Sequence, residues 1–221
     1  MPFDLDFFES VPVLGIIRGV KLNSLQGVVE ASIAAGLNYL EITQNTPDYI
    51  KFIKLINKEY PSVKVGAGTV ISLADAKMAF DAGAKFLVAP DFNEQIAEFC
   101  IEKDLSYFPG ALTPTEIQKA WSSGATMVKV FPASQMGPAY FKQVKGPFDK
   151  IKLMAVGGVN PSNIKDYLSS GADAVALGGS IYSIKRMENG LFNEIQNDIE
   201  DFLIEVKSFY SKMNVNNLTN C

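Results

Sequence analysis

The stretch Met127–Ala133, M-V-K-V-F-P-A, has the composition of a short buried strand, with valines on both sides of Lys129 and Pro132 ending the run. A lysine inside such a strand loses hydration, which disfavours its charged form and lowers its pKa by up to ~3–5 units when burial is complete. A lysine with a lowered pKa is a nucleophile that condenses with carbonyl groups to form a Schiff base. The alternative is a lysine at a strand end whose ammonium group reaches solvent.

The pattern around this stretch recurs along the whole chain. Ser123-Gly124 closes a helix just before it, and another helix is expected from about Pro138. Seven further apolar runs have the same character: Val13–Gly19, Tyr39–Asn45, Val63–Thr69, Phe86–Asp91, Ser106–Ala111, Lys152–Val159 and Ala174–Ser180. Continuous apolar strands are typical of parallel strands buried on both faces, and eight strand–helix units in one domain predict an α/β fold, a single (β/α)8 TIM barrel. A doubly wound sheet is the alternative, but the sequence has no obvious topological break of the kind that it needs.

The barrel is expected to span residues 1–212, followed by a polar C-terminal tail over residues 213–221. At the start, the apolar segment Phe3–Phe8 predicts a helical turn that covers one end of the barrel. At the end, apolar positions from Phe192 to Phe209 step by three and four residues, as an amphipathic helix over about Leu191–Lys212 requires.

Composition narrows the classes of function. The 221 residues are 48% hydrophobic and carry a net charge of −4 with no basic run, which argues against nucleic acid and anionic membrane surfaces as partners. There is no apolar run of ~18 residues, and Met1–Ser10 lacks the basic and apolar regions of a signal peptide. Because Cys100 and Cys221 are the only cysteines, no disulfide framework is expected, and a cytoplasmic location is favoured.

The sequence contains no histidine, which removes Ser-His-Asp and Cys-His catalysis and the zinc sites that use histidine. No clear set of carboxylate ligands for a metal is present either. The remaining polar candidates gather at the carboxyl ends of the expected strands, where barrel enzymes have their active sites: Arg18, Glu41, Thr43, Asn45, Thr69, Asp91 and Lys129.

Alternation along the second strand connects these candidates. Glu41 and the polar residues two and four positions later share one face of that strand. If that face is interior, a carboxylate lies across the barrel from Lys129. Each candidate also has a purely structural explanation. Glu41 would pair with a neighbouring cation, Thr69 would cap the next helix, and Arg18 would hold strand ends together.

Two glycine-rich segments, Gly157-Gly158 and Gly178-Gly179-Ser180, follow the seventh and eighth strands. Barrels commonly bind phosphate at these two places through backbone N–H groups. One such pair would be explained by turn chemistry alone, but two pairs at both expected places favour a phosphate site.

Together these segments resemble the aldolases that cleave 2-keto-3-deoxy-6-phosphogluconate (KDPG), with their 6-phosphogalactonate and 4-hydroxy-2-oxoglutarate (KHG) relatives. The resemblance covers Val13 to about Tyr182 and rests on the order and spacing of L-G-I-I-R-G-V, E-I-T, V-G-A-G-T-V, P-G-A-L-T-P-T-E, V-K-V-F-P-A, G-P-A-Y-F-K, K-G-P-F, A-V-G-G-V and L-G-G-S. It implies a class I aldolase without metal or other cofactor. Its substrate would be a phosphorylated 2-keto acid, 2-dehydro-3-deoxy-6-phosphogluconate, cleaved to pyruvate and D-glyceraldehyde 3-phosphate.

The resemblance also implies roles for individual residues. Lys129 falls on the Schiff-base lysine and Glu41 on the general acid/base. Thr69 falls on the threonine that binds the pyruvate carboxylate, and Arg18 on a cation of the carboxylate or proton network. The other expected substrate contacts are Pro90, Phe131, Val156, Gly157, Gly158, Gly179 and Ser180.

The sequence departs from parts of the family pattern. Asn45 stands where some members have an arginine, whereas Arg18 matches members that carry the arginine on the first strand. Gluconate-type members often read P-T-G-G after the seventh strand, but Ala155-Val156-Gly157-Gly158 resembles the galactonate type, so the preferred C4 epimer stays open. The resemblance further suggests a homotrimer.

Two other classes of function share the glycine loops. One is another phosphate-binding barrel enzyme, such as a sugar-phosphate epimerase or a thiamine-phosphate synthase. The other is an inactive barrel that only binds a phosphorylated metabolite or serves as an interaction scaffold.

Overall fold

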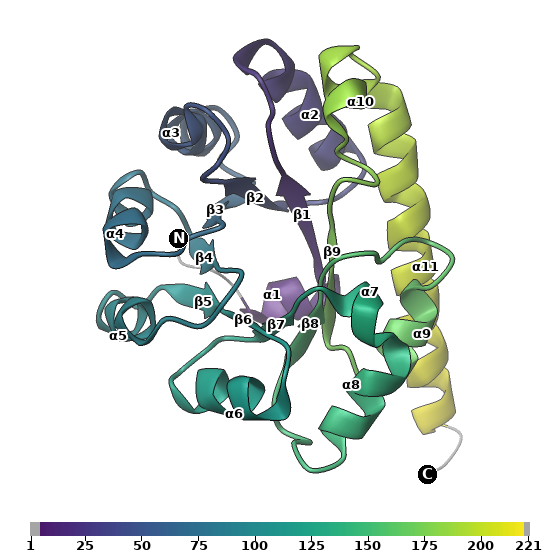
Figure 1. Ribbon diagram of the computed structural model, residues 1–221. Helices are drawn as coiled ribbons and strands as arrows, with labels where there is room; N and C mark the ends of the chain where they lie inside the picture. Colours follow the sequence, from purple (N-terminus) through teal and green to yellow (C-terminus); the bar gives the residue numbers. More distant parts are fainter. Residues whose placement is uncertain (1–4, 219–221) are drawn as a thin grey trace.

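A computed structural model describes residues 5–218 and contains nine parallel strands surrounded by helices (Figure 1). The strands are β1 (Val13–Ile17), β2 (Tyr39–Thr43), β3 (Lys64–Gly68), β4 (Phe86–Val88), β5 (Ser106–Phe108), β6 (Gly110–Ala111), β7 (Val128–Val130), β8 (Leu153–Ala155) and β9 (Ala174–Leu177).

These strands occupy the eight positions of a closed barrel. The sheet order is β5-β4-β3-β2-β1-β9-β8-β7-β6, so β5 and β6 are its two ends. Both are halves of one segment that Pro109 interrupts, because proline has no N–H to donate to the ladder. Backbone hydrogen bonds to the neighbouring strands continue on both sides of the break: Ala89 N–H donates to Phe108 O (3.1 Å), and Lys129 N–H donates to Pro109 O (2.8 Å). The predicted (β/α)8 barrel is confirmed, whereas the prediction of one unbroken fifth strand is wrong at this proline.

Helices form the outer ring of the barrel (Figure 1). They are α2 (Leu22–Ala34), α3 (Tyr49–Glu59), α4 (Leu73–Asp81), α5 (Glu94–Glu102), α6 (Pro114–Ser122), α7 (Ala133–Met136), α8 (Pro138–Lys145), α9 (Ile164–Ser169), α10 (Ile184–Glu188) and α11 (Phe192–Leu218), while α1 (Leu5–Ser10) lies inside the ring of strands. Glycines end four of the helices, as predicted for Gly124, with φ between 86° and 99° at Gly36, Gly83, Gly124 and Gly171.

The sequence did not predict the short helices α7 and α10. In addition, α11 continues past Lys212 to Leu218, into the segment that was expected to be a polar tail. Residues 1–4 and 219–221 lie outside the described part of the chain, and the division into barrel and tail stays a prediction.

The interior of the barrel is packed at its amino end. Along β1, Leu14 faces the interior cluster, while Val13 and Ile17 face the helices. Phe8 of α1 is fully buried against the interior side chains, with ring centroids 4.9 Å from Tyr39 and 6.4 Å from Phe108. The helix α1 therefore closes this end, as predicted, and a cavity for a ligand is left to the carboxyl ends of the strands.

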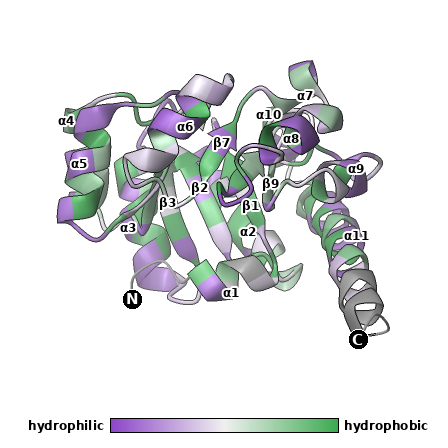
Figure 2. Ribbon diagram, turned by 90° about the horizontal axis from the view of Figure 1, so that it is seen from below, coloured by the Kyte–Doolittle hydropathy of each residue, from purple (hydrophilic) through white to green (hydrophobic). Residues whose placement is uncertain are grey.

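The distribution of hydrophobic residues agrees with a packed barrel interior that α1 closes at one end. Figure 2 shows hydrophobic residues on the central strands and α1 at the opposite end of the molecule from α7 and α10. Within residues 5–218, no helix has both the length and the apolar character needed to cross a membrane.

Candidate active site

Lys129 and Glu41 lie on opposite parts of the barrel wall and are both buried. Glu41 is in β2, where it pairs in register with Ile16 of β1 and Gly66 of β3. Lys129 is in β7, in register with Gly110 of β6. Their exposed fractions are 1% for Glu41 and 6% for Lys129, so the alternative of a solvent-reaching lysine does not describe this side chain.

The carboxylate of Glu41 occupies space that Gly68 leaves open. A Cβ atom at Gly68 would lie 1.5 Å from Glu41 Oε1. Gly66, two residues earlier on the same strand face, makes the corresponding room for Phe86, whose ring would lie 2.4 Å from an added Cβ. The G-A-G sequence is therefore part of a strand whose glycines accommodate neighbouring side chains, and no sequence pattern indicated this role of Gly68.

Burial raises the pKa of Glu41 from 4.5 to about 7, although the positive charges of Lys129 and Arg18 oppose the increase. Its Oε2 atom is buried and has no hydrogen-bond partner among the described residues. Among the described residues, no ion pair with an N–O distance of 4.0 Å or less involves Glu41, Lys129 or Arg18. Glu41 therefore forms no direct ion pair with either cation, contrary to the structural explanation considered for it. With a pKa of about 7, its carboxyl group can exchange a proton near neutral pH.

Loss of hydration lowers the pKa of Lys129, and the positive charge of Arg18 lowers it further, whereas Glu41 acts in the opposite direction. Its Nζ atom lies 5.0 Å from the centre of the Phe131 ring. A lowered pKa increases the fraction of neutral amine, which is the form that attacks a carbonyl carbon.

Thr69 directly follows β3 and has φ = +60°, a left-handed conformation that is rare for a β-branched residue. The residue that caps α4 is instead Ser72, whose side chain accepts a bond from Asp75 N–H (3.1 Å). The explanation of Thr69 as a helix cap is therefore wrong. Strained backbone of this kind is concentrated at functional sites.

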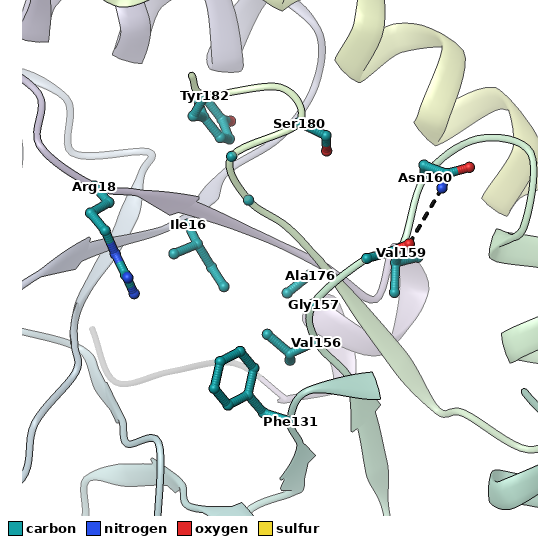
Figure 3. Close-up of a pocket in the computed structure, with 13 residues that line it drawn as sticks. Ile16, Arg18, Phe131, Val156, Gly157, Val159, Asn160, Ala176, Ser180 and Tyr182 are labelled. Carbon is teal, nitrogen blue, oxygen red and sulfur yellow. Dashed lines mark hydrogen bonds between the residues drawn. The ribbon is translucent and has the colours of Figure 1, made fainter. Parts of the chain in front are cut away.

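A cavity of about 420 Å³ lies at the carboxyl ends of β1, β7, β8 and β9 (Figure 3). Seven of the eleven predicted site residues line it: Arg18, Phe131, Val156, Gly157, Gly158, Gly179 and Ser180. Gly178, part of the predicted glycine-rich segment, also lines it, as do five residues that the sequence did not single out: Ile16, Val159, Asn160, Ala176 and Tyr182. The only sequence signal for these five is that each lies within three residues of a predicted site residue.

The two glycine loops meet in this cavity and offer unpaired donors. Among the described residues, no backbone hydrogen bond engages the N–H groups of Gly157, Gly158, Gly179 or Ser180. Such N–H groups bind anions where no side chain blocks the approach.

Phe131 separates this cavity from a second one of about 360 Å³, and its side chain is 41% exposed. Pro90 lines only the second cavity, so the structure does not place it with the glycine loops. Lys129, Glu41 and Thr69 line neither cavity, but Glu41 adjoins Ile16 of the first cavity wall and Lys129 adjoins Phe131.

Comparison with known sequences agrees with this geometry. Residues 6–197 match the family described as KDPG and KHG aldolase. The chain belongs to this aldolase family. It is 35% identical over 174 residues to a probable 2-dehydro-3-deoxy-6-phosphogalactonate aldolase of Rhizobium meliloti, covering 77% of this chain and 82% of the relative. It is 33% identical over 171 residues to a 2-dehydro-3-deoxy-phosphogluconate aldolase of Pseudomonas aeruginosa, covering 77% and 76%.

Solved structures of the family have the same fold. A structure described as native KDPGal matches with a TM-score of 0.86 and 26% identity, over 96% of this chain and all of that one. The KDPG aldolase of Legionella pneumophila, with pyruvate captured at low pH as a covalent carbinolamine intermediate, matches with a TM-score of 0.81 and 27% identity, over 87% and 94%.

Proposed function

We propose that this protein is a class I aldolase that cleaves 2-dehydro-3-deoxy-6-phosphogluconate to pyruvate and D-glyceraldehyde 3-phosphate. The observation that carries the proposal is a buried lysine of lowered pKa together with a buried carboxyl group whose pKa is raised to about 7. The neighbouring glycine loops, with unengaged N–H groups, support a phosphorylated substrate.

In the proposed mechanism, the neutral amine of Lys129 attacks the C2 ketone of the substrate, and loss of water gives an iminium ion. Glu41 accepts the proton of the C4 hydroxyl as the C3–C4 bond breaks. The bonding electrons move into the iminium, which becomes an enamine, and the aldehyde leaves. Glu41 then returns a proton to C3, and hydrolysis releases pyruvate and restores Lys129.

The remaining residues bind and orient the substrate. Arg18 and Thr69 bind the carboxylate of the pyruvate portion or its proton network, while Pro90 and Phe131 supply apolar walls. Backbone N–H groups of Gly157, Gly158, Gly179 and Ser180 bind the distal phosphate. This division is supported by Arg18 and both glycine loops lining one cavity.

The galactonate epimer of the same substrate is the second candidate. Val156 favours it, because its side chain lines the cavity and has no hydroxyl group to bond the C4 hydroxyl. KHG, which lacks the phosphate, would use the same lysine without the glycine loops.

Borohydride trapping tests the proposal directly. Incubation with pyruvate and borohydride should add a pyruvate-derived mass to the peptide that contains Lys129, and Lys129→Ala should abolish both labelling and turnover. An epimerase, a thiamine-phosphate synthase or an inactive binding barrel needs no iminium. Labelling at another lysine, or no labelling, would contradict the class I mechanism.

Metal independence is tested separately. Among the described residues, no three His, Cys, Asp or Glu side chains are grouped so that they could hold a metal ion. Activity should therefore survive exhaustive chelation. Loss of activity with EDTA and its return with magnesium or manganese would contradict the mechanism.

The homotrimer and the cytoplasmic location stay predictions of this proposal. Sedimentation should give about three times the chain mass of 24.1 kDa, and a monomer at micromolar concentration would contradict the trimer.

A further inference from the structure

Two asparagines hold the loop that follows β8. Asn163 Nδ2 donates to Gly158 O (3.0 Å), and Asn163 Oδ1 accepts from Asn160 N–H (2.9 Å). Asn160 Nδ2 donates to the same Gly158 carbonyl (3.3 Å), and its Oδ1 accepts from Ser162 N–H (3.0 Å) and Ser162 Oγ–H (2.6 Å). The Gly158 carbonyl therefore has two side-chain donors, and its direction is fixed.

The direction of this carbonyl also fixes the next N–H group. Phe131–Pro132 is the cis peptide bond of the described chain, so the bond between Gly158 and Val159 is trans. In a trans peptide the N–H and C=O groups point in opposite directions. The Val159 N–H therefore points away from Asn160 and Asn163, the donors to the Gly158 carbonyl, and Val159 itself lines the cavity (Figure 3). No backbone hydrogen bond between described residues engages this N–H.

A tether is needed because the glycine next to this peptide leaves it free to rotate. Gly158 has φ = +81° and no side chain to restrict the plane that follows it. A rotated plane would turn a carbonyl oxygen toward a bound phosphate, where two negative partners repel each other. The asparagine bonds oppose that rotation.

We propose that Asn163 is a positioning residue of the phosphate site, which orients the Gly158–Val159 peptide so that the Val159 N–H donates to the phosphate. This inference rests on the proposed function and adds one donor to those of Gly157, Gly158, Gly179 and Ser180. Asn163 touches the loop and acts on the substrate only through it.

Titration of the wild-type protein with inorganic phosphate tests the donor without relying on catalysis. The ¹⁵N–¹H resonance of Val159 should move downfield together with that of Ser180. Movement at Ser180 without movement at Val159, or no response at all, would overturn the inference. An enzyme without aldol cleavage but with a responding Val159 would refute the proposed function and leave this inference standing.

Substitution tests the positioning role. Asn163→Ala should raise KM for the phosphorylated substrate by about tenfold or more while kcat changes by less than about threefold, because a charge-assisted bond is lost. The rate of borohydride trapping with pyruvate, which has no phosphate, should stay within about threefold by the same reasoning.

Asn57→Ala is the matched control, because Asn57 Nδ2 also donates to a glycine carbonyl, Gly83 O, at 3.0 Å but in the turn between α4 and β4. Two results would show that Asn163 has only a structural role. One is an equal loss, in Asn163→Ala, of activity on the phosphorylated substrate and of trapping with pyruvate. The other is the same increase in KM in Asn57→Ala. If Asn163→Ala does not fold, the phosphate titration of the wild-type protein decides whether the Val159 N–H binds phosphate, and an unresponsive Val159 overturns the inference.

Discussion

At Glu41, burial and neighbouring positive charge act on the pKa in opposite directions. Burial has the larger effect, and the pKa rises to about 7 despite Lys129 and Arg18. A group with this pKa is populated in both protonation states near neutral pH, as a residue that accepts and returns a proton must be. At Lys129 the same loss of hydration lowers the pKa. Burial therefore prepares both groups for their proposed steps.

Glu41→Gln tests this account through stability. The folded-state pKa of about 7 lies above the ordinary 4.5, so the folded protein binds more protons than the unfolded chain between these pH values. Its stability relative to the variant should therefore fall as pH rises from 4.5 to 8, by up to about 3 kcal/mol. Urea unfolding of both proteins at pH 4.5 and 8 measures this difference.

The same variant should lose about 10²–10⁴-fold in kcat, because general acid–base assistance is removed. The wild-type kcat/KM should rise with pH through a pKa near 7, and Glu41→Gln should lack this rise. In the urea unfolding measurements, by contrast, an increase in the stability of the wild type relative to Glu41→Gln between pH 4.5 and 8 would indicate that the charged Glu41 carboxylate forms a stabilising ion pair.

Val156 tests the choice between the two C4 epimers. Its side chain is buried in the interior cluster and lines the cavity. One hydrogen bond contributes a net ~0.5–1.5 kcal/mol, so Val156→Thr should shift the kcat/KM ratio toward the gluconate epimer by roughly two- to tenfold. The wild type should cleave both epimers within about two decades, because one such contact cannot enforce strict discrimination. Val156→Ala, which adds no hydroxyl, serves as the control, and an unchanged ratio in Val156→Thr would place the discrimination elsewhere.

For single residues, the sequence predicted only those features of the site that depend on the periodicity of a strand. Alternation with a period of two placed Glu41 on one face of its strand with the polar residues that follow it, but it did not decide whether that face is the barrel interior. The left-handed backbone of Thr69 could not be predicted, since no rule of local propensity favours it for a β-branched residue. The position of Phe131 between two cavities also depends on how distant side chains pack.

Among the elements, β3 contributes to the site mainly by what it lacks. Its two glycines share one face of the strand and leave room there for Glu41 from β2 and for Phe86 from β4. The carboxylate can therefore lie within the wall of the barrel, away from solvent, which is the cause of its raised pKa. A strand that would be weakened by glycine in isolation is retained here because its neighbours fill the space.

Gly68→Ala should displace the carboxylate of Glu41, because the added Cβ would lie 1.5 Å from Oε1 and 2.1 Å from Cδ. We expect kcat to fall by about 10²-fold or more and the pKa near 7 in the pH profile to shift. Combined with Glu41→Gln, the glycine substitution should cost little further activity, since residues in contact are not additive.

Gly66→Ala is the matched control in the same strand. Its Cβ would meet the ring of Phe86, at 2.4 Å, and not the carboxylate. It should lower stability without moving the activity pKa. Equal effects of the two substitutions on the pH profile would show that β3 acts only through the general stability of the barrel.

Element boundaries were predictable where chain chemistry sets them. Glycines in the left-handed region marked four helix ends, and Pro109 marks the break between β5 and β6, because proline cannot donate to the ladder. The short helices α7 and α10 carried no periodic pattern, because four or five residues are too few to show one.

For the whole molecule, closure of the barrel joins segments that are distant in sequence. Arg18 after β1, Phe131 after β7 and the loops after β8 and β9 line one cavity because β1, β9, β8 and β7 are consecutive in the sheet. The closure was predictable from the number of strand–helix units. A ligand that contacts both glycine loops binds only the closed barrel, so its binding should stabilise the entire fold.

D-glycerol 3-phosphate, which carries the phosphate without the keto acid, tests this coupling. At a hundred times its Kd it should stabilise the protein by about 2.7 kcal/mol, which corresponds to a rise in Tm of roughly 5–11 °C for a chain of this size. Gly179→Ala is the informative variant, because an added Cβ meets no atom within 4 Å and no left-handed φ is involved. Its Tm without ligand should stay within about 2 °C of the wild type, yet the methyl group would stand at the cavity wall between the backbone donors and the phosphate. The ligand-induced rise in Tm should therefore shrink, and a rise as large as that of the wild type would mean that the phosphate binds away from the loop after β9.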